Sequence, residues 1–220
     1  YLKDNVENFP TYECNKYGFR GDDWDAGEKG AIFLGCSDIF GIGNHYEETA
    51  SCIVAKELGV KNYNLGTPAG GLDQVYRCLK YYIKDINADT VFFLIPEASR
   101  RELYTFGNHP LTPSFMYFDG IGAHMNINEE EYRNLRDFYF KYLCNDTYMF
   151  LETNKSLDAI RYLCMSENKR LIEIKNPYFY DDYKDTCQFP IDENDIAADL
   201  VHRGKKFQKQ IADTFIKKNT

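Results

Sequence analysis

The alternation of short apolar runs with longer amphipathic segments is the feature that most limits how this chain can fold. The short runs are typical of buried strands, and in the longer segments apolar residues recur at helical spacing. Because the two kinds of segment alternate, we predict a three-layer α/β domain with a mostly parallel central sheet. The expected strands are 31–34, 61–65, 91–95 and 171–174, and the expected helices are 47–58, 72–86, 129–144, 156–168 and 204–217.

The length of the chain indicates one domain. Its 220 residues can build one sizeable core and leave little room for two. We therefore expect a single domain over residues 1–220. Residues 105–128 break the alternation with aromatic, Gly- and Pro-containing sequence that is long for an ordinary connection, and we expect a lid or insertion there.

The charge balance argues against a nucleic-acid partner. The chain has 26 Lys and Arg against 34 Asp and Glu, which gives a net charge of −8, and the two signs are mixed along the sequence. Nucleic-acid binders normally present a basic face. No apolar stretch approaches the length of a membrane span, so we expect a soluble protein without one.

The cysteines give no sign of a disulfide framework or a zinc site. There are seven, they lie far apart, and they form neither a C-x-x-C pair nor a zinc-like spacing with His. An odd set of free thiols favours a reducing compartment such as the cytoplasm. We expect neither a metal nor another cofactor.

The first strand leads into a glycine-containing segment, residues 35–43, that places Ser37 in a turn before a helix. A serine there has its hydroxyl at the carboxyl edge of the sheet, near backbone amides that stabilise negative charge. In the alternative interpretation Ser37 only caps a helix. A phosphate-binding loop is disfavoured because the segment lacks both the Gly-Lys-Ser/Thr ending and the Gly-x-Gly-x-x-Gly spacing.

Asp199 and His202 lie three residues apart, directly before the last expected helix. In a helical turn residues at this spacing share a face, so the carboxylate and the imidazole can point to one place. Such an aspartate can fix the ring tautomer while the other nitrogen accepts a proton from a serine. A surface His paired with an acid at a helix start is the alternative.

A glycine-rich turn, residues 64–71, ends the second expected strand. Its backbone can approach a ligand closely and offer N–H groups to an oxyanion. It can equally be a plain strand-to-helix turn.

Taken together, these three segments resemble the ordered sequence blocks of the SGNH (GDSL-type) hydrolases. Residues 15–21, Asn-Lys-Tyr-Gly-Phe-Arg-Gly, also resemble a segment that precedes the first block in some branches of the family. The resemblance implies a flavodoxin-like sheet and a metal-free Ser-His-Asp triad that hydrolyses carboxyl esters, thioesters or acetyl groups on sugars.

The resemblance also implies a role for individual residues. Ser37 would be the nucleophile, His202 the general base and later acid, and Asp199 the residue that orients His202. The Ser37 backbone N–H and an N–H of the turn at Ala69 and Gly70 would hold the oxyanion; Ala69 stands where the family usually has Gly.

Two positions depart from the family pattern. Cys36 replaces the acid of Gly-Asp-Ser, and its place beside Ser37 argues against a thiol nucleophile. After the third strand, the Asn that donates to the oxyanion is absent. Losing one such donor typically costs about a hundred- to a thousand-fold in turnover.

Ser99 or Arg100 could take over the missing donor role, or Arg100 could meet the carboxylate of an anionic substrate. Alternatively, Arg100 and Arg101 simply pair with Glu97 and Glu102 on a solvated turn.

Two functions therefore follow from the sequence. The preferred hypothesis is a serine esterase for a small-molecule or glycan ester, including O-acetyl groups on glycans. The competing hypothesis is a weakly active or inactive SGNH-like module that binds a ligand or glycan. The absent Asn favours the module, whereas the retention of Ser37, Asp199 and His202 favours the enzyme.

Overall fold

A four-stranded, all-parallel sheet forms the middle layer of the protein. The computed structural model describes residues 9–24, 27–100, 102–104, 110–111, 129–143, 145–175, 192, 194–199 and 201–220. The strands are β1 (Gly30–Leu34), β2 (Lys61–Asn64), β3 (Ala88–Ile95) and β6 (Arg170–Lys175). They are ordered β2-β1-β3-β6, which is the flavodoxin-like order.

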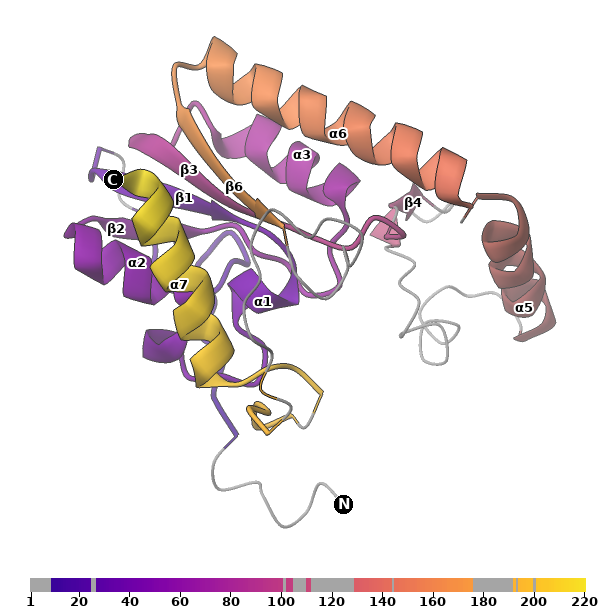
Figure 1. Ribbon diagram of the computed structural model, residues 1–220, viewed down its shortest axis with the longest axis horizontal. Coiled ribbons are helices and arrows are strands. Elements are labelled where there is room, and N and C mark those ends of the chain that lie inside the picture. Colours follow the sequence, from indigo (N-terminus) through magenta and orange to yellow (C-terminus); the bar gives the residue numbers. More distant parts are fainter. Residues whose placement is uncertain are drawn as a thin grey trace.

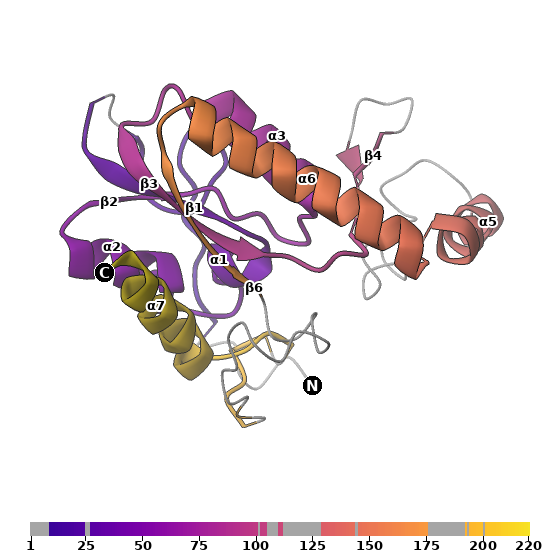
Figure 2. The ribbon, with the colours of Figure 1, turned by 45° about the horizontal axis from the view of Figure 1, so that its top comes forward.

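Helices cover both faces of this sheet (Figures 1 and 2). The helices α2 (Ala50–Leu58) and α7 (Lys205–Asn219) pack on one face, and α3 (Leu72–Tyr82) and α6 (Asp146–Ser166) pack on the other. Strand β1 is buried along its whole length. Its residues Ala31 and Phe33 belong to the core on the α2 and α7 side, whereas Ile32 and Leu34 belong to the core on the α3 and α6 side. This two-sided burial explains why the strands appear as continuous apolar runs.

The predicted three-layer fold and all four predicted strands are confirmed. The helix predicted over 47–58 is divided, because Thr49 accepts a hydrogen bond from the Cys52 N–H (3.3 Å) and caps α2 after the short 3₁₀ helix η2 (Tyr46–Glu48). Helix α6 begins ten residues before the predicted start at 156, where Asn145 accepts from the Tyr148 N–H (3.0 Å).

Other short elements lie around the carboxyl edge of the sheet. A four-residue helix, α1 (Ser37–Phe40), follows β1, and a short antiparallel pair, β4 (Leu103–Tyr104) and β5 (Pro110–Leu111), follows β3. Helix α5 (Glu129–Phe138) continues into a π-helical turn, η4 (Tyr139–Leu143), within the predicted helix 129–144. The predicted lid or insertion at 105–128 lies outside the described residues except for residues 110–111.

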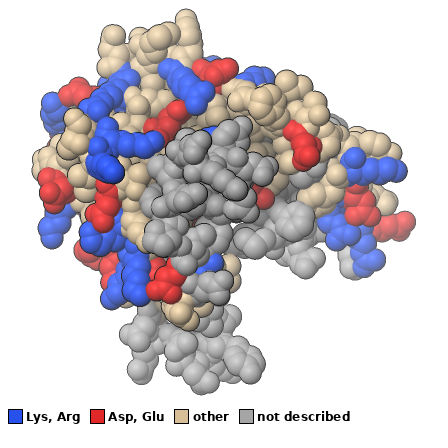
Figure 3. All heavy atoms as spheres, in the orientation of Figure 1, with Lys and Arg blue, Asp and Glu red and all other residues tan. Residues whose placement is uncertain are grey.

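The described surface carries mixed charge. In Figure 3 basic and acidic side chains are interspersed over the visible face. No helix among the described residues is long and apolar enough to cross a membrane.

Two residues on α6 test the packing of this helix against the sheet. Ile160 is fully buried, whereas the Tyr162 side chain is 67% exposed. We expect Ile160→Ala to lower the free energy of unfolding by about 2–5 kcal/mol, because the lost apolar contact leaves a cavity. Tyr162→Ala is the control and should change it by no more than about 0.5 kcal/mol. Urea titration followed by circular dichroism measures both, and equal effects would contradict the burial of this face.

Candidate active site

The sheet topology places a switch point at the carboxyl edge of β1. The chain passes from β1 to β2 on one side and later crosses to β3 on the other side. In open α/β sheets, ligands bind where the strand order reverses in this way. The loops that follow β1, β2 and β3 therefore meet at one edge. They contain Ser37, Ala69, Gly70, Ser99 and Arg100, whereas Asp199 and His202 lie directly before α7.

Ser37 lies in the loop after β1, as the first residue of α1. It is buried, with 6% of its surface exposed, and its hydroxyl donates to the Cys36 thiol over 3.9 Å. Its backbone N–H donates to none of the described residues. The Ser37 hydroxyl therefore makes only one long hydrogen bond, and its backbone N–H can donate to an anion.

Asp199 and His202 form a close pair. Their Oδ2 and Nδ1 atoms are 2.5 Å apart, and Asp199 Oδ1 accepts from the backbone N–H groups of Val201 (3.1 Å) and His202 (3.0 Å). Burial raises the pKa of Asp199, but the hydrogen bonds from His202 and Val201 outweigh it, so the pKa lies below its usual value. The carboxylate therefore stays ionised and holds the imidazole in a fixed orientation.

The loop that follows α1 packs directly on this pair. The Ala198 N–H donates to the Gly43 carbonyl (3.0 Å), and the Asn44 side chain donates to the Arg203 carbonyl (3.0 Å). A Cβ at Gly43 would lie 2.8 Å from Asp199 Oδ1. Among the described residues, however, no hydrogen bond joins Ser37 to His202. The structure thus brings the two segments together and forms the Asp199 to His202 contact, but not the contact with Ser37.

Arg20 holds the loop that follows α1 from the other side. The sequence alone did not assign a role to this residue. Its guanidinium is buried and donates to the carbonyls of Phe40 (3.0 Å), Gly41 (2.6 Å) and Asn44 (2.8 Å). It also lies over the ring of Tyr12, 4.8 Å from its centroid, and the Tyr12 hydroxyl accepts from the Gly43 N–H (2.8 Å). The only sequence signal was its place in the segment 15–21.

The glycine-rich turn after β2 is hydrogen-bonded to the loop after β1. The Asn64 side chain donates to the Ile39 carbonyl (2.8 Å) and accepts from the Gly66 N–H (2.8 Å). The Thr67 N–H donates to the Gly35 carbonyl (3.3 Å). These bonds fix the turn beside Ser37.

Within this turn, Ala69 and Gly70 differ in the state of their amides. The Gly70 N–H donates to the Thr67 carbonyl (3.0 Å), whereas the Ala69 N–H donates to none of the described residues. Ala69 adopts φ +58°, a conformation that favours glycine, which is the residue that the family usually has here. Of the two amides, that of Ala69 is better placed to serve an oxyanion.

The turn after β3 contains Ser99 and Arg100, and both bind Glu97. The Ser99 hydroxyl donates to Glu97 Oε1 (2.6 Å), and Arg100 Nε donates to Glu97 Oε2 (3.3 Å). The predicted pairing of Arg100 with Glu97 is thus present, but the idea of a solvated turn is wrong, because the Arg100 side chain is only 4% exposed. Glu102 pairs with Arg77, and Arg101 lies outside the described residues.

Cys36 is unsuited to act as a nucleophile. It is fully buried, and burial, together with the charge of Asp38, raises the pKa of its thiol. The charge of Arg100 lowers this pKa in part. A thiol with a raised pKa carries little of the reactive thiolate at neutral pH.

No group of three or more potential metal-binding side chains occurs among the described residues.

Comparisons with known proteins give structural matches alone. No family model and no curated protein matches the chain. Among solved structures, the chain is similar to a protein of the G-D-S-L family from Desulfitobacterium hafniense DCB-2, with 9% identity over 87% of this chain and 99% of that chain and a TM-score of 0.40. It is also similar to LAE5, an alpha/beta hydrolase from the metagenome of Lake Arreo, with 13% identity, 89% and 96% coverage and a TM-score of 0.39. A third similar structure is a Clostridium thermocellum family 3 carbohydrate esterase, with 16% identity, 86% and 94% coverage and a TM-score of 0.39.

Two glycines test the contact between the Ser37 loop and Asp199. Gly43 and Gly59 have similar positive φ angles, +74° and +65°, but an added Cβ would collide with Ala197 and Asp199 only at Gly43 and would meet nothing at Gly59. We expect Gly59→Ala to cost about 1–2 kcal/mol of unfolding free energy from the backbone alone. Gly43→Ala should cost about 1–3 kcal/mol more, because of overpacking. Denaturant titrations measure both losses of unfolding free energy. Equal losses would show that the Ser37 loop is not in close contact with Asp199 at Gly43.

Proposed function

We propose that this protein is a serine esterase of the SGNH type that acts on carboxyl esters. The observation that carries the proposal is the 2.5 Å contact between Asp199 and His202 in a segment packed on the loop that follows Ser37. A buried serine, a histidine and an ionised carboxylate at the switch point of a parallel sheet suit nucleophilic acyl transfer.

The proposed reaction has two steps. The Ser37 oxygen attacks the ester carbonyl while His202 Nε2 accepts the serine proton and passes it to the departing alcohol. This gives an acyl-serine. His202 then removes a proton from a water molecule, whose oxygen attacks the acyl carbonyl. The bond between the acyl group and the Ser37 oxygen breaks, and His202 returns the proton to this oxygen as the acid leaves. Asp199 accepts the hydrogen bond from Nδ1–H and stabilises the imidazolium in both steps. The Ser37 to His202 hydrogen bond would form on substrate binding, since catalytic hydrogen bonds often tighten only in the complex.

Three groups are proposed as oxyanion donors. Two are the backbone N–H groups of Ser37 and Ala69, neither of which donates a hydrogen bond to any of the described residues. The third is the Arg100 side chain, which replaces the family's absent Asn. Ser99 is the weaker choice, because its single hydroxyl proton already goes to Glu97, whereas the Arg100 guanidinium has five N–H donors, of which Nε donates to Glu97.

The proposed substrates are carboxyl esters of small molecules or glycans, with O-acetyl groups on glycans as one class. A single domain over residues 1–220 remains part of the proposal, and no metal or other cofactor has a role in it.

Variants of the proposed triad test the enzyme against the binding module. We expect the parent protein to be labelled by a fluorophosphonate probe and to hydrolyse p-nitrophenyl acetate. Ser37→Ala and His202→Ala should lower turnover by about 10⁴-fold or more, because the nucleophile or its base is lost. Cys36→Ala is the matched control and should keep labelling. If the folded parent shows no labelling and no Ser37-dependent turnover, the chain is a binding module and the esterase proposal fails.

Ser99 and Arg100 test the third oxyanion donor. Arg100→Gln should lower kcat by about 10²- to 10³-fold with little change in KM, since the donor acts on charge that develops in the transition state. Ser99→Ala should change kcat only a few-fold. Steady-state kinetics with p-nitrophenyl acetate measure both, and denaturant titration checks that each variant is folded. The opposite ranking would assign the donor role to Ser99.

A further inference from the structure

A small cavity lies beside the candidate active site, between the carboxyl ends of β3 and β6 and the first half of α6. Its volume is about 120 Å³. Most of its wall is apolar. Ile95 lies at the end of β3 and Ala98 in the turn that follows, whereas Phe150 and Leu157 come from α6. A water molecule occupies about 30 Å³ in the liquid, so the cavity has room for a group the size of about four waters.

The register of the sheet places this cavity close to Ser37. Leu34, the last residue of β1, pairs with Phe93, and Ile95, two residues further along β3, lines the cavity. Neighbouring strands are about 4.8 Å apart. The cavity thus begins at the carboxyl end of the strand next to β1, and β1 leads into the turn that carries Ser37.

The cavity lies on the side of the sheet where the acyl group is expected. His202 precedes α7, which packs on the opposite face from α6. The alcohol that leaves must lie near His202, because the imidazole protonates it. The acyl chain then extends away from His202, toward α6 and the cavity.

Three polar residues, Thr153, Asn154 and Lys175, interrupt the apolar wall, and two of them carry the argument. Thr153 is 8% exposed, and its hydroxyl oxygen is buried without a hydrogen-bond partner among the described residues. Lys175, at the end of β6, brings an ammonium group to the cavity. Burial lowers the pKa of Lys175, as does the charge of Arg161, while Glu173 raises it. A partly desolvated cation beside a buried hydroxyl is suited to an anion, since electrostatic attraction is stronger away from water.

We propose that this cavity is an acyl-binding subsite for short saturated acyl chains that end in a carboxylate. This inference rests on the proposed esterase function and names its substrate class. The apolar wall contacts the methylene groups, while Lys175 and Thr153 donate to the terminal carboxylate. Two methylene groups and a carboxylate, as in a hemiester of succinic acid, match the volume of the cavity.

A pair of esters of equal shape tests the subsite. Monoethyl succinate carries the carboxylate, and in ethyl 4-methylpentanoate an uncharged isopropyl group takes its place. We expect the parent to favour monoethyl succinate by about 10- to 100-fold in kcat/KM, as is usual for hydrogen bonds to a charged group. Lys175→Met should abolish this preference, Lys175→Arg should retain part of it, and Thr153→Val should reduce it several-fold.

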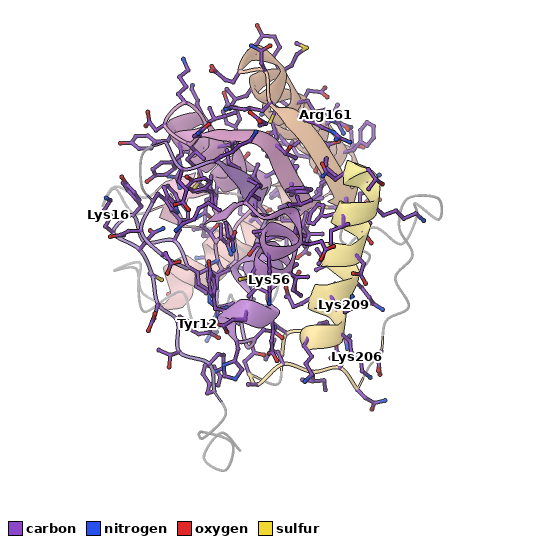
Figure 4. The ribbon with its side chains drawn as sticks, turned by 90° about the vertical axis from the view of Figure 1, so that its left-hand side faces the viewer. Tyr12, Lys16, Lys56, Arg161, Lys206 and Lys209 are labelled. Carbon is purple, nitrogen blue, oxygen red and sulfur yellow. The ribbon has the colours of Figure 1, made fainter. Side chains whose placement is uncertain are left out.

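The matched control is Lys209→Met. Lys209 lies on α7, far along the chain from the cavity residues, with a side chain that is 65% exposed and paired with Asp213 (Figure 4). This variant removes one positive charge, as Lys175→Met does, and should leave both the activity and the preference unchanged. If it lowers the preference as much as Lys175→Met does, the effect comes from net charge and the subsite is overturned.

Two outcomes separate the subsite from the esterase function. Ser37-dependent hydrolysis of ethyl acetate without any preference for monoethyl succinate would overturn the subsite and leave the esterase intact. If no ester is hydrolysed, the esterase proposal fails. In that case, calorimetry measures whether succinate binds to the parent protein and to Lys175→Met. Binding that Lys175→Met weakens at least tenfold supports an anion site there, whereas no binding, or binding equal in the two proteins, overturns it.

Discussion

The buried guanidinium of Arg20 holds together the part of the structure on which the candidate site depends. A charge in the interior is costly unless hydrogen bonds replace its water. Arg20 meets this requirement with three backbone carbonyls between Phe40 and Asn44, and aromatic rings surround it. These carbonyls belong to the end of α1 and the loop that follows. The requirement to satisfy one cation thus fixes the path of the chain directly after Ser37.

That path determines where Asp199 and His202 lie. The loop held by Arg20 presents Gly43 to the segment before α7, and the absence of a side chain at Gly43 leaves room for the Asp199 carboxylate. On the other side, Asn64 connects α1 to the turn that contains Ala69. The loop that follows Ser37 is therefore supported by a buried cation, a close glycine contact and a side-chain amide. Each support comes from a different part of the chain.

The carboxyl edge of the sheet also accounts for the proposed substrate subsite. Helix α6 lies over β3 and β6, and its first half lines the cavity beside the site. The early start of α6 was not predicted, because exposed Phe150 and Leu151 blur the amphipathic pattern of its first turns. The break at Thr49 was also missed, since a single side-chain cap overrides a pattern that otherwise continues. Both errors concern helix boundaries, where local pattern is weakest.

The sequence by itself determined the α/β layers, the four parallel strands and the pairing of Asp199 with His202. These features depend on contacts close in the chain or on burial, and apolar periodicity and i,i+3 spacing record both. Only the tertiary structure decided that Arg20 is buried, that the Ala69 amide rather than that of Gly70 is available among the described residues, and that Thr153 and Lys175 share a cavity. Those features join residues that are distant in sequence or depend on individual hydrogen bonds, and one sequence carries no record of which distant residues meet.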